Sequence, residues 1–234
     1  MRIFYQLARN IASNLDKTLG TNTKERGGRI YRYSLKKWSS CRRIIDPLRI
    51  RLSYKFGFSD HRNLRLHLGC GTKHFDGYIN VDLWITAATD VICDVTRLPW
   101  PDNSAEIIEC YHVIEHISHR KIQQTLSEWR RVLKPGGILI LECPHFDMAI
   151  NEYKEGREDR LINIFGHQRY PGDMHLYGYN PQRMIKLLRE SGFNNFVEDS
   201  PQSSQSLDEP SFRIECRKSN KLSTNYQKIS ECSK

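Results

Sequence analysis

The sequence predicts an α/β domain with a doubly wound, mostly parallel sheet covered on both faces. From residue 65 onward, short apolar runs typical of buried strands alternate with segments that have helical spacing. A Gly-Cys-Gly turn follows the first run directly, where such sheets bind ligands. The 62 residues before this domain differ in composition and predict a separate extension.

Seven strands and two helices are expected in this domain. The strands are expected at 65–68, 78–83, 90–95, 106–113, 138–143, 195–198 and 212–216. Ile122, Leu126, Trp129 and Leu133 recur at helical spacing, and residues 134–137 (KPGG) should end that helix in a turn. Asn180 is placed to cap a second helix that has Pro181 at its first position and runs to Ser191.

The charge of the chain is unevenly distributed. The formal net charge is +9, but residues 1–62 carry +11 and residues 63–234 carry −2. An apolar stripe at helical spacing (Ile3, Phe4, Leu7, Ile11, Leu15, Leu19) makes the extension partly amphipathic. We therefore divide the chain into a basic helical extension (1–62), a domain (63–218) and a polar tail (219–234). The extension is expected to attach to an anionic membrane, a partner protein or the domain's own sheet.

Composition excludes several other classes of protein. With 38% hydrophobic and 27% charged residues, the chain reads as globular, and no apolar run is long enough to cross a bilayer. The seven cysteines include no CxxC pair, which argues against zinc-ribbon and redox motifs and favours a reducing compartment. We expect a cytoplasmic protein with a peripheral membrane or partner contact through residues 1–60.

Three strand ends carry the residues that indicate chemistry. Gly69 and Gly71 allow a tight turn and the close approach of a ligand to the backbone. The next strand ends at Asp82, where a carboxylate can accept hydrogen bonds from both hydroxyls of a ribose. The third ends at Asp94, which is placed to bind an exocyclic amine. The pattern predicts a nucleoside site.

These blocks resemble those of class I S-adenosylmethionine-dependent methyltransferases, most closely the methyltransferase type 11 group. The matching segments are LHLGCGT, INVDL, CDVTRLPWPDNS, EIIECYHVIEHI and RRVLKPGGILILECP. The resemblance implies a Rossmann-like seven-stranded sheet with an antiparallel last strand, and S-adenosyl-L-methionine as cofactor. The cofactor-binding residues that it implies are Leu68, Gly69, Cys70, Gly71, Asp82, Leu83, Asp94, Val95, Tyr111 and His112.

Two departures from the family pattern stand near the first strand. His67 replaces the usual acid, and Lys73 replaces the usual third glycine. Only ten residues separate Gly71 from Asp82, too few for the usual first crossover helix. Either the first two strands are joined unusually tightly, or residues before 65 supply the missing cover.

The acceptor and the catalytic base are less well marked. Residues 144–180 contain the stretch GHQRYPGDMHLYGYN, dense in His, Tyr and Gly, and are expected to form the acceptor pocket with a lid or, equally, an ordinary surface loop. His112 or His175 is the expected general base. For Glu115 and His116 we favour capping and packing over catalysis, and no cluster has the sequence spacing of metal ligands, so no metal is expected.

The expected function is methyl transfer to a small-molecule or glycan acceptor, at a hydroxyl. The Asn/Asp-Pro-Pro-Tyr type sequence of many amino-group methyltransferases is absent after the fourth strand, where ECYHV stands. Three alternatives remain open. They are an RNA methyltransferase that uses the basic extension, a membrane-surface enzyme with a lipid-linked acceptor, and a non-catalytic cofactor-binding scaffold.

Overall fold

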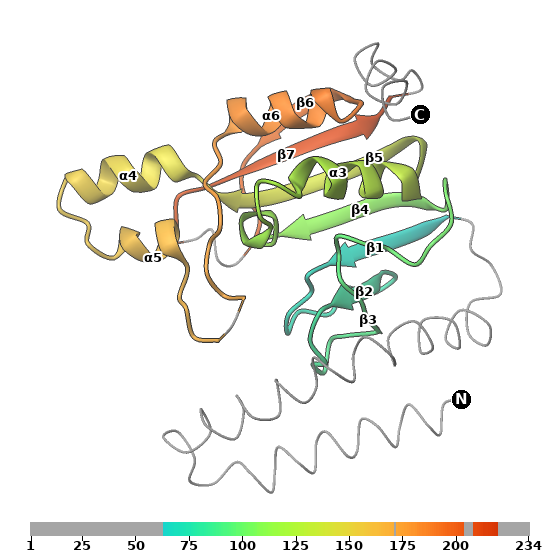
Figure 1. Cartoon of the computed structure of the whole chain (residues 1–234), viewed down its shortest axis with the longest axis horizontal. Helices are drawn as coiled ribbons and strands as arrows, with labels where there is room; N and C mark the ends of the chain where they lie inside the picture. Colours follow the sequence, from blue (N-terminus) through green and yellow to red (C-terminus); the bar gives the residue numbers. More distant parts are fainter. Residues whose placement is uncertain (1–62, 171, 204–207, 220–234) are drawn as a thin grey trace, which may run out of the picture. The chain divides into compact units, whose positions relative to one another are not determined.

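A computed structural model of the chain describes residues 63–170, 172–203 and 208–219 (Figure 1). The predictions made for the basic extension and for most of the polar tail lie outside these residues. None of the described helices is long and apolar enough to span a membrane.

The described residues form one seven-stranded sheet, as predicted (Figure 1). Its spatial order is β3-β2-β1-β4-β5-β7-β6. Neighbouring strands are parallel except at β7, which runs antiparallel to both β5 and β6. The strands are β1 (Leu64–Leu68), β2 (Ile79–Asp82), β3 (Val91–Ile92), β4 (Ala105–Tyr111), β5 (Leu133–Pro144), β6 (Phe193–Asp199) and β7 (Ser211–Lys218). The order reverses between β1 and β4, which is where open α/β sheets bind ligands.

One face of the sheet is apolar and fully buried. Alternate residues of adjacent strands come into line there, for example Leu66 beside Ile108 and Ile108 beside Leu139. Two helices belong to this face, α3 (Ile122–Val132) and α6 (Pro181–Glu190). The crossovers β4–α3–β5 and β5–α6–β6 step in the same direction along the sheet. Because such crossovers are right-handed, two that step in the same direction place their helices on the same face of the sheet. The core therefore lies between this face and the two helices (Figure 1).

The opposite face receives no helix from the first two connections, and its cover by residues 1–62 lies outside the described residues. Among the described residues no helix joins β1 to β2 or β2 to β3, because these connections are too short to form one. A tight first connection, one of the two alternatives, is what the structure shows. Phe75, from this connection, stacks on the ring of His67 with centroids 3.9 Å apart, and so packs against the face in place of a helix.

Other elements differ in extent from the prediction. Residues 134–137 belong to β5 and do not form a separate turn. Gly136, with φ of +74°, lies where the β4–β5 register shifts, so the glycines make a bulge in the strand. The segment 144–180 contains two helices that were not predicted, α4 (Phe146–Lys154) and α5 (Arg160–Phe165).

The predicted cap of α6 is confirmed and gives a first testable expectation. The Asn180 side-chain oxygen accepts a hydrogen bond of 2.7 Å from the Arg183 amide, and Pro181 stands at the first helical position. Asn180→Ala should lower the free energy of unfolding by about 1 kcal/mol, because this amide loses its partner. Asn180→Ser, which keeps a capping oxygen, should recover most of the loss in a urea titration. Equal losses in both variants would contradict the capping role.

Candidate active site

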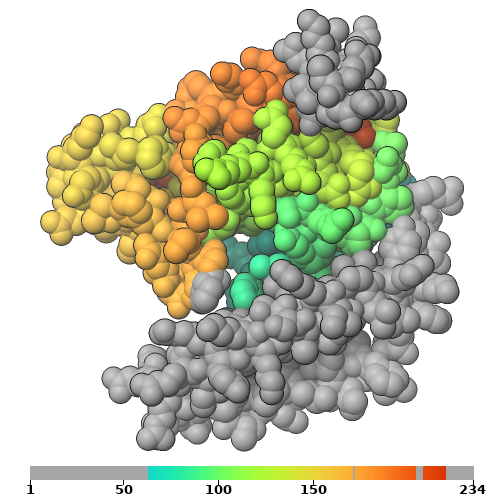
Figure 2. Space-filling model, viewed as in Figure 1, coloured from blue at the N-terminus to red at the C-terminus, as the bar shows by residue number. Residues whose placement is uncertain are grey.

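A cavity of about 1320 Å³ opens at the carboxyl ends of β1 to β4. This volume exceeds the roughly 300–1,000 Å³ of a typical small-molecule site. Figure 2 shows the surface hollowed between the teal residues that follow β1 and β2 and the orange residues of the segment 144–180. The cavity therefore has room for two ligands side by side.

The Gly-rich turn forms one wall of this cavity. Gly69 and Gly71 have φ of +71° and +54°, in the left-handed region that favours glycine. A Cβ on Gly69 would lie 2.1 Å from Cγ2 of Val113, whereas one on Gly71 would meet no atom within 4 Å. The thiol of Cys70, between them, is buried, and burial raises its pKa to about 11. Cys70 therefore serves as packing in the turn and not as a nucleophile.

Asp82 fastens the Gly-rich turn to the end of β2. Its Oδ2 accepts a hydrogen bond of 2.8 Å from the Gly71 amide, and its Oδ1 accepts one of 2.8 Å from the Trp84 amide. The side chain is 9% exposed and lines the cavity. A carboxylate can accept about four hydrogen bonds, so each oxygen still has capacity for a ligand donor.

Asp94 and its neighbours form a second polar position of the cavity. Asp94 Oδ1 accepts hydrogen bonds from the amide and the hydroxyl of Thr96, at 2.9 and 2.7 Å. Its Oδ2 has no hydrogen-bond partner within the described residues. Val95 and the exposed Leu83 line the same cavity. One free carboxylate oxygen beside apolar side chains suits a flat heterocycle that carries an amine.

Tyr111 lies at the carboxyl end of β4 and belongs to a polar network. Its hydroxyl donates to Glu109 at 2.5 Å and accepts from Arg213 at 3.2 Å. Tyr78 donates to the same carboxylate of Glu109. Burial and the hydrogen bond to Glu109 raise the pKa of Tyr111, so its hydroxyl stays protonated. The ring lines the cavity, while the hydroxyl is held by the sheet.

His112 follows β4 with φ of +52°, a conformation that is uncommon for a residue other than glycine. Its Nε2 lies 3.1 Å from the Ser203 hydroxyl, and its Nδ1 lies 3.6 Å from Glu115 Oε1. Burial lowers the pKa of His112, but the carboxylates of Glu115 and Glu142 outweigh that effect and raise it overall. Both ring nitrogens are thus already engaged.

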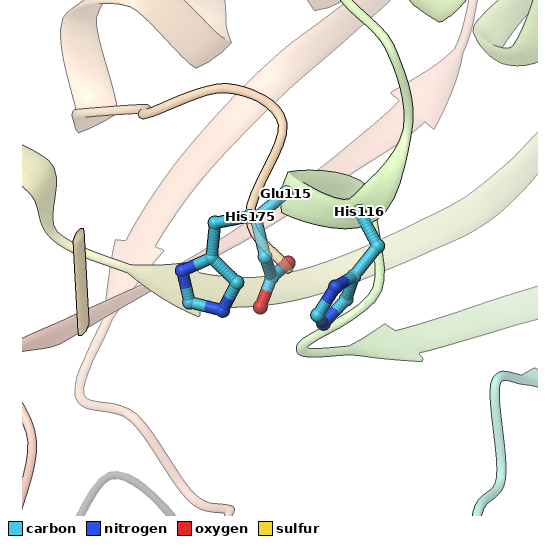
Figure 3. A group of neighbouring side chains, drawn as sticks. All are labelled: Glu115, His116 and His175. Atoms are coloured by element: carbon cyan, nitrogen blue, oxygen red, sulfur yellow. The ribbon is translucent and has the colours of Figure 1, made fainter. Parts of the chain in front are cut away.

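Glu115, His116 and His175 meet in the same cavity (Figure 3). Glu115 and His116 come from the single-turn helix η1 (Ile114–His116), and His175 comes from the loop before α6. One nitrogen or oxygen atom from each of the three lies within 4.8 Å of the others. Figure 3 shows the carboxylate of Glu115 between the two imidazole rings.

The segment 144–180 closes over this cluster and is tied to it by its backbone. The amides of Leu176 and Tyr177 both donate to the Glu115 carbonyl, at 2.8 and 3.3 Å. His167 lines the cavity and is exposed. His145 lies apart from it, because its Nδ1 caps α4 by accepting from the Met148 amide. Of the histidines in this segment, His175 alone joins the cluster.

The fold of the described residues is similar to that of solved methyltransferases. Residues 66–141 match the type 11 family model described as a methyltransferase domain. Over these residues the chain is similar to class I S-adenosylmethionine-dependent methyltransferases. A possible histamine N-methyltransferase from Thermotoga maritima has the same fold, with a TM-score of 0.50 and 17% identity, over 80% of this chain and 96% of that one.

Curated relatives match more locally. The ubiquinone/menaquinone biosynthesis C-methyltransferase UbiE of Cupriavidus taiwanensis is 25% identical over 114 residues, 44% of this chain and 46% of that protein. The tRNA N(3)-cytidine methyltransferase METTL2 of Danio rerio is 37% identical over 60 residues, 25% of this chain and 17% of that protein. The chain thus spans less than half the length of these relatives.

The cofactor of this family of methyltransferases is S-adenosylmethionine, and the cavity fits it. Asp82 offers acceptor capacity for a ribose, and Asp94 offers an unpartnered oxygen for an amine. The glycine turn leaves the cavity wall without side chains at Gly71. These are the features that a sulfonium nucleoside requires: a diol acceptor, an amine acceptor and close access to the backbone.

The sequence did not indicate that Glu115 and His116 meet His175. Their place in a helix-starting loop favours capping and packing. Their partner His175 stands 59 positions after His116 and reaches them only through the fold. The available sequence signal was the placement of the EH pair after a strand end, where such sheets bind ligands.

Proposed function

We propose that this protein transfers a methyl group from S-adenosylmethionine to a hydroxyl oxygen of a small-molecule or glycan acceptor. When bound, the cofactor supplies the methyl carbon, and its sulfur keeps the electron pair of the broken bond. The residues proposed to hold it are Leu68, Gly69, Cys70, Gly71, Asp82, Leu83, Asp94, Val95, Tyr111 and His112.

Two carboxylates carry the recognition of the cofactor in this proposal. Asp82 accepts from the ribose hydroxyls while its own bonds to the Gly71 and Trp84 amides keep it in place. Asp94 accepts from the adenine amine through Oδ2, with Oδ1 fixed by Thr96. Because both carboxylates are oriented by the backbone before binding, little side-chain entropy is lost on binding.

The observation that carries the choice of a hydroxyl acceptor is the Glu115, His116 and His175 cluster in the same cavity. Methyl transfer needs alignment of nucleophile, methyl group and sulfur, and a hydroxyl must also lose its proton. All three side chains have proton-accepting atoms. His175 is therefore retained as the activating histidine, and His112, 3.6 Å from Glu115, becomes a positioning residue for that carboxylate.

The relatives suggest other acceptors, a quinone-ring carbon for UbiE and a tRNA cytidine for METTL2. Residues 63–234 carry a net charge of −2, and the acceptor part of the cavity includes the carboxylate of Glu115. This charge disfavours a polyanion as ligand of the domain itself. A small neutral acceptor with a hydroxyl group is the better match to these groups.

The test is methyl transfer from isotopically labelled S-adenosylmethionine to a panel of acceptors, with identification of the methylated atom. The panel contains sugars, lipid-linked glycans, polyprenyl hydroquinones and tRNA. We expect labelling at a hydroxyl oxygen of a sugar, lipid-linked glycan or other small molecule. Labelling only on carbon, only on RNA or on none of these would overturn the proposal, and cofactor binding with no product from any acceptor would favour the scaffold function.

His175→Gln is expected to lower kcat by about 100-fold while cofactor affinity stays unchanged, because the activation of the hydroxyl is lost. His119→Gln is the matched control, since His119 is exposed and outside the cavity lining. Turnover of His175→Gln equal to that of the control would contradict the role of the cluster.

A further inference from the structure

We infer that Glu115, His116 and His175 hold a divalent transition-metal ion at the acceptor end of the cavity. The role of the ion in methyl transfer rests on the proposed function, whereas the binding of the ion does not. The three side chains offer two imidazole nitrogens and one carboxylate oxygen, all within 4.8 Å of one another. At metal–ligand bonds of about 2.1 Å, tetrahedral ligand atoms stand roughly 3.4 Å apart, so small side-chain rotations suffice.

The backbone fixes both imidazoles in the tautomer that a metal requires. His175 Nδ1 lies 2.8 Å from the Asn163 carbonyl, and His116 Nδ1 lies 3.0 Å from the Met174 carbonyl. A carbonyl only accepts, so each Nδ1 is the protonated nitrogen and each Nε2 has a lone pair. Metal-binding histidines nearly always have this outer hydrogen bond, often to a backbone carbonyl.

The buried carboxylate of Glu115 is the member of the cluster that is most unusual in a protein interior. Its side chain is 3% exposed, and both carboxylate oxygens lack a hydrogen-bond partner within the described residues. The nearest ring nitrogen, His112 Nδ1, stands 3.6 Å from Oε1, within ion-pair range but beyond hydrogen-bond length. A buried carboxylate without hydrogen bonds is costly, and a bound cation would compensate for that cost.

The ligand set indicates the class of ion. Imidazole ligands favour Zn²⁺, Fe²⁺, Co²⁺ or Ni²⁺, whereas Mg²⁺ and Ca²⁺ prefer sites made only of oxygen atoms. Two histidines and one carboxylate leave coordination positions open, and the cluster lines the cavity. With the ion bound, His175 would activate the acceptor as a metal ligand and not as a base. An acceptor hydroxyl on the ion would have a lowered pKa and would release its proton to water as its oxygen bonds to the methyl carbon.

The test uses Co²⁺ as the probe on the full-length protein after treatment with a chelator. We expect one Co²⁺ per chain, with an absorption spectrum of nitrogen and oxygen ligands and no thiolate charge-transfer band. His116→Gln and His175→Gln should each weaken binding at least about 100-fold, since each removes one of three ligands. His119→Gln should bind as the wild type does, and Mg²⁺ should not displace Co²⁺ at equal concentration.

Several results would overturn the inference. They are an absence of Co²⁺ binding, a thiolate spectrum, or the same affinity in His116→Gln, His175→Gln and His119→Gln. Thermal unfolding of each variant shows whether it is still folded. If His116→Gln or His175→Gln has lost its fold, the Co²⁺ affinity of the other variant tests the inference. Co²⁺ binding is measured without cofactor or acceptor, so its result does not depend on turnover. An absence of Co²⁺ binding, together with methyl transfer by chelator-treated protein, would overturn this inference alone. Conversely, tight Co²⁺ binding without methyl transfer would overturn the proposed function alone.

Discussion

Asp82→Asn is expected to weaken the binding of S-adenosylmethionine by roughly 10- to 150-fold, which corresponds to about 1.5–3 kcal/mol for hydrogen bonds to a charged group. The wild-type carboxylate accepts from the Gly71 and Trp84 amides, each at 2.8 Å. In the asparagine variant one of these backbone donors must face an amide NH₂ group, which is also a donor. The turn loses its anchor, and the ribose hydroxyls lose an acceptor.

Asp76→Asn is the matched control for this prediction, because the Asp76 side chain is fully exposed and outside the cavity lining. The measurement is the Kd for the cofactor by calorimetry, with circular dichroism to confirm that both variants are folded. If the two variants bind equally well, Asp82 does not bind the ribose.

Gly69→Ala is expected to reduce stability far more than Gly71→Ala. Both positions have positive φ, so both variants incur the cost of about 1–2 kcal/mol for a left-handed non-glycine residue. At Gly69 the new Cβ also lies 2.1 Å from Val113 Cγ2, and overpacking of that kind typically costs about 1–3 kcal/mol more. For a domain of this size each kcal/mol corresponds to a Tm shift of about 2–4 °C.

The two glycine variants are compared by thermal unfolding without cofactor, so that any effect on binding does not enter. The difference in Tm between them isolates the contact with Val113 from the strain of the backbone. Equal Tm values would mean that Val113 moves aside without cost and that the turn is less tightly packed than the distance indicates.

The positions of the strands and the cofactor end of the site could be predicted because their signals are local. A strand followed by a glycine turn, or by an aspartate, is readable within a few residues, and parallel strands bring their carboxyl ends to one edge. Asp82 and Asp94 therefore line one cavity, as the sequence indicated. The cap of α6 at Asn180 was readable for the same reason.

The acceptor end could not be predicted because it depends on contacts between distant segments. The helices α4 and α5 are short, and the stretch after them, residues 166–180, is rich in His, Tyr and Gly, which favoured a loop or lid for the whole segment. His175 reaches Glu115 only because the amides of Leu176 and Tyr177 bond to the Glu115 carbonyl. A sequence pattern within either segment does not reveal such a pairing.

The polar face of the sheet was also beyond local patterns. Glu109, Arg213 and Glu142 occupy strand positions whose side chains would meet a helix in a sheet covered on both faces. They form a network, with Glu142 accepting from the Gln202 and Ser203 amides and Arg213 3.6 Å from the same carboxylate. The predictions for residues 1–62, including membrane attachment and cover of the sheet, concern residues outside the described part and stay predictions.

Titration calorimetry of the full-length protein with S-adenosylmethionine decides whether the cavity is a cofactor site. We expect binding of one cofactor per chain, competition by S-adenosylhomocysteine, and a weaker Kd in Asp82→Asn but not in Asp76→Asn. A folded protein that gives no binding heat at any temperature tested, or an Asp82→Asn variant with wild-type affinity, would contradict the assignment of the cavity as a cofactor site.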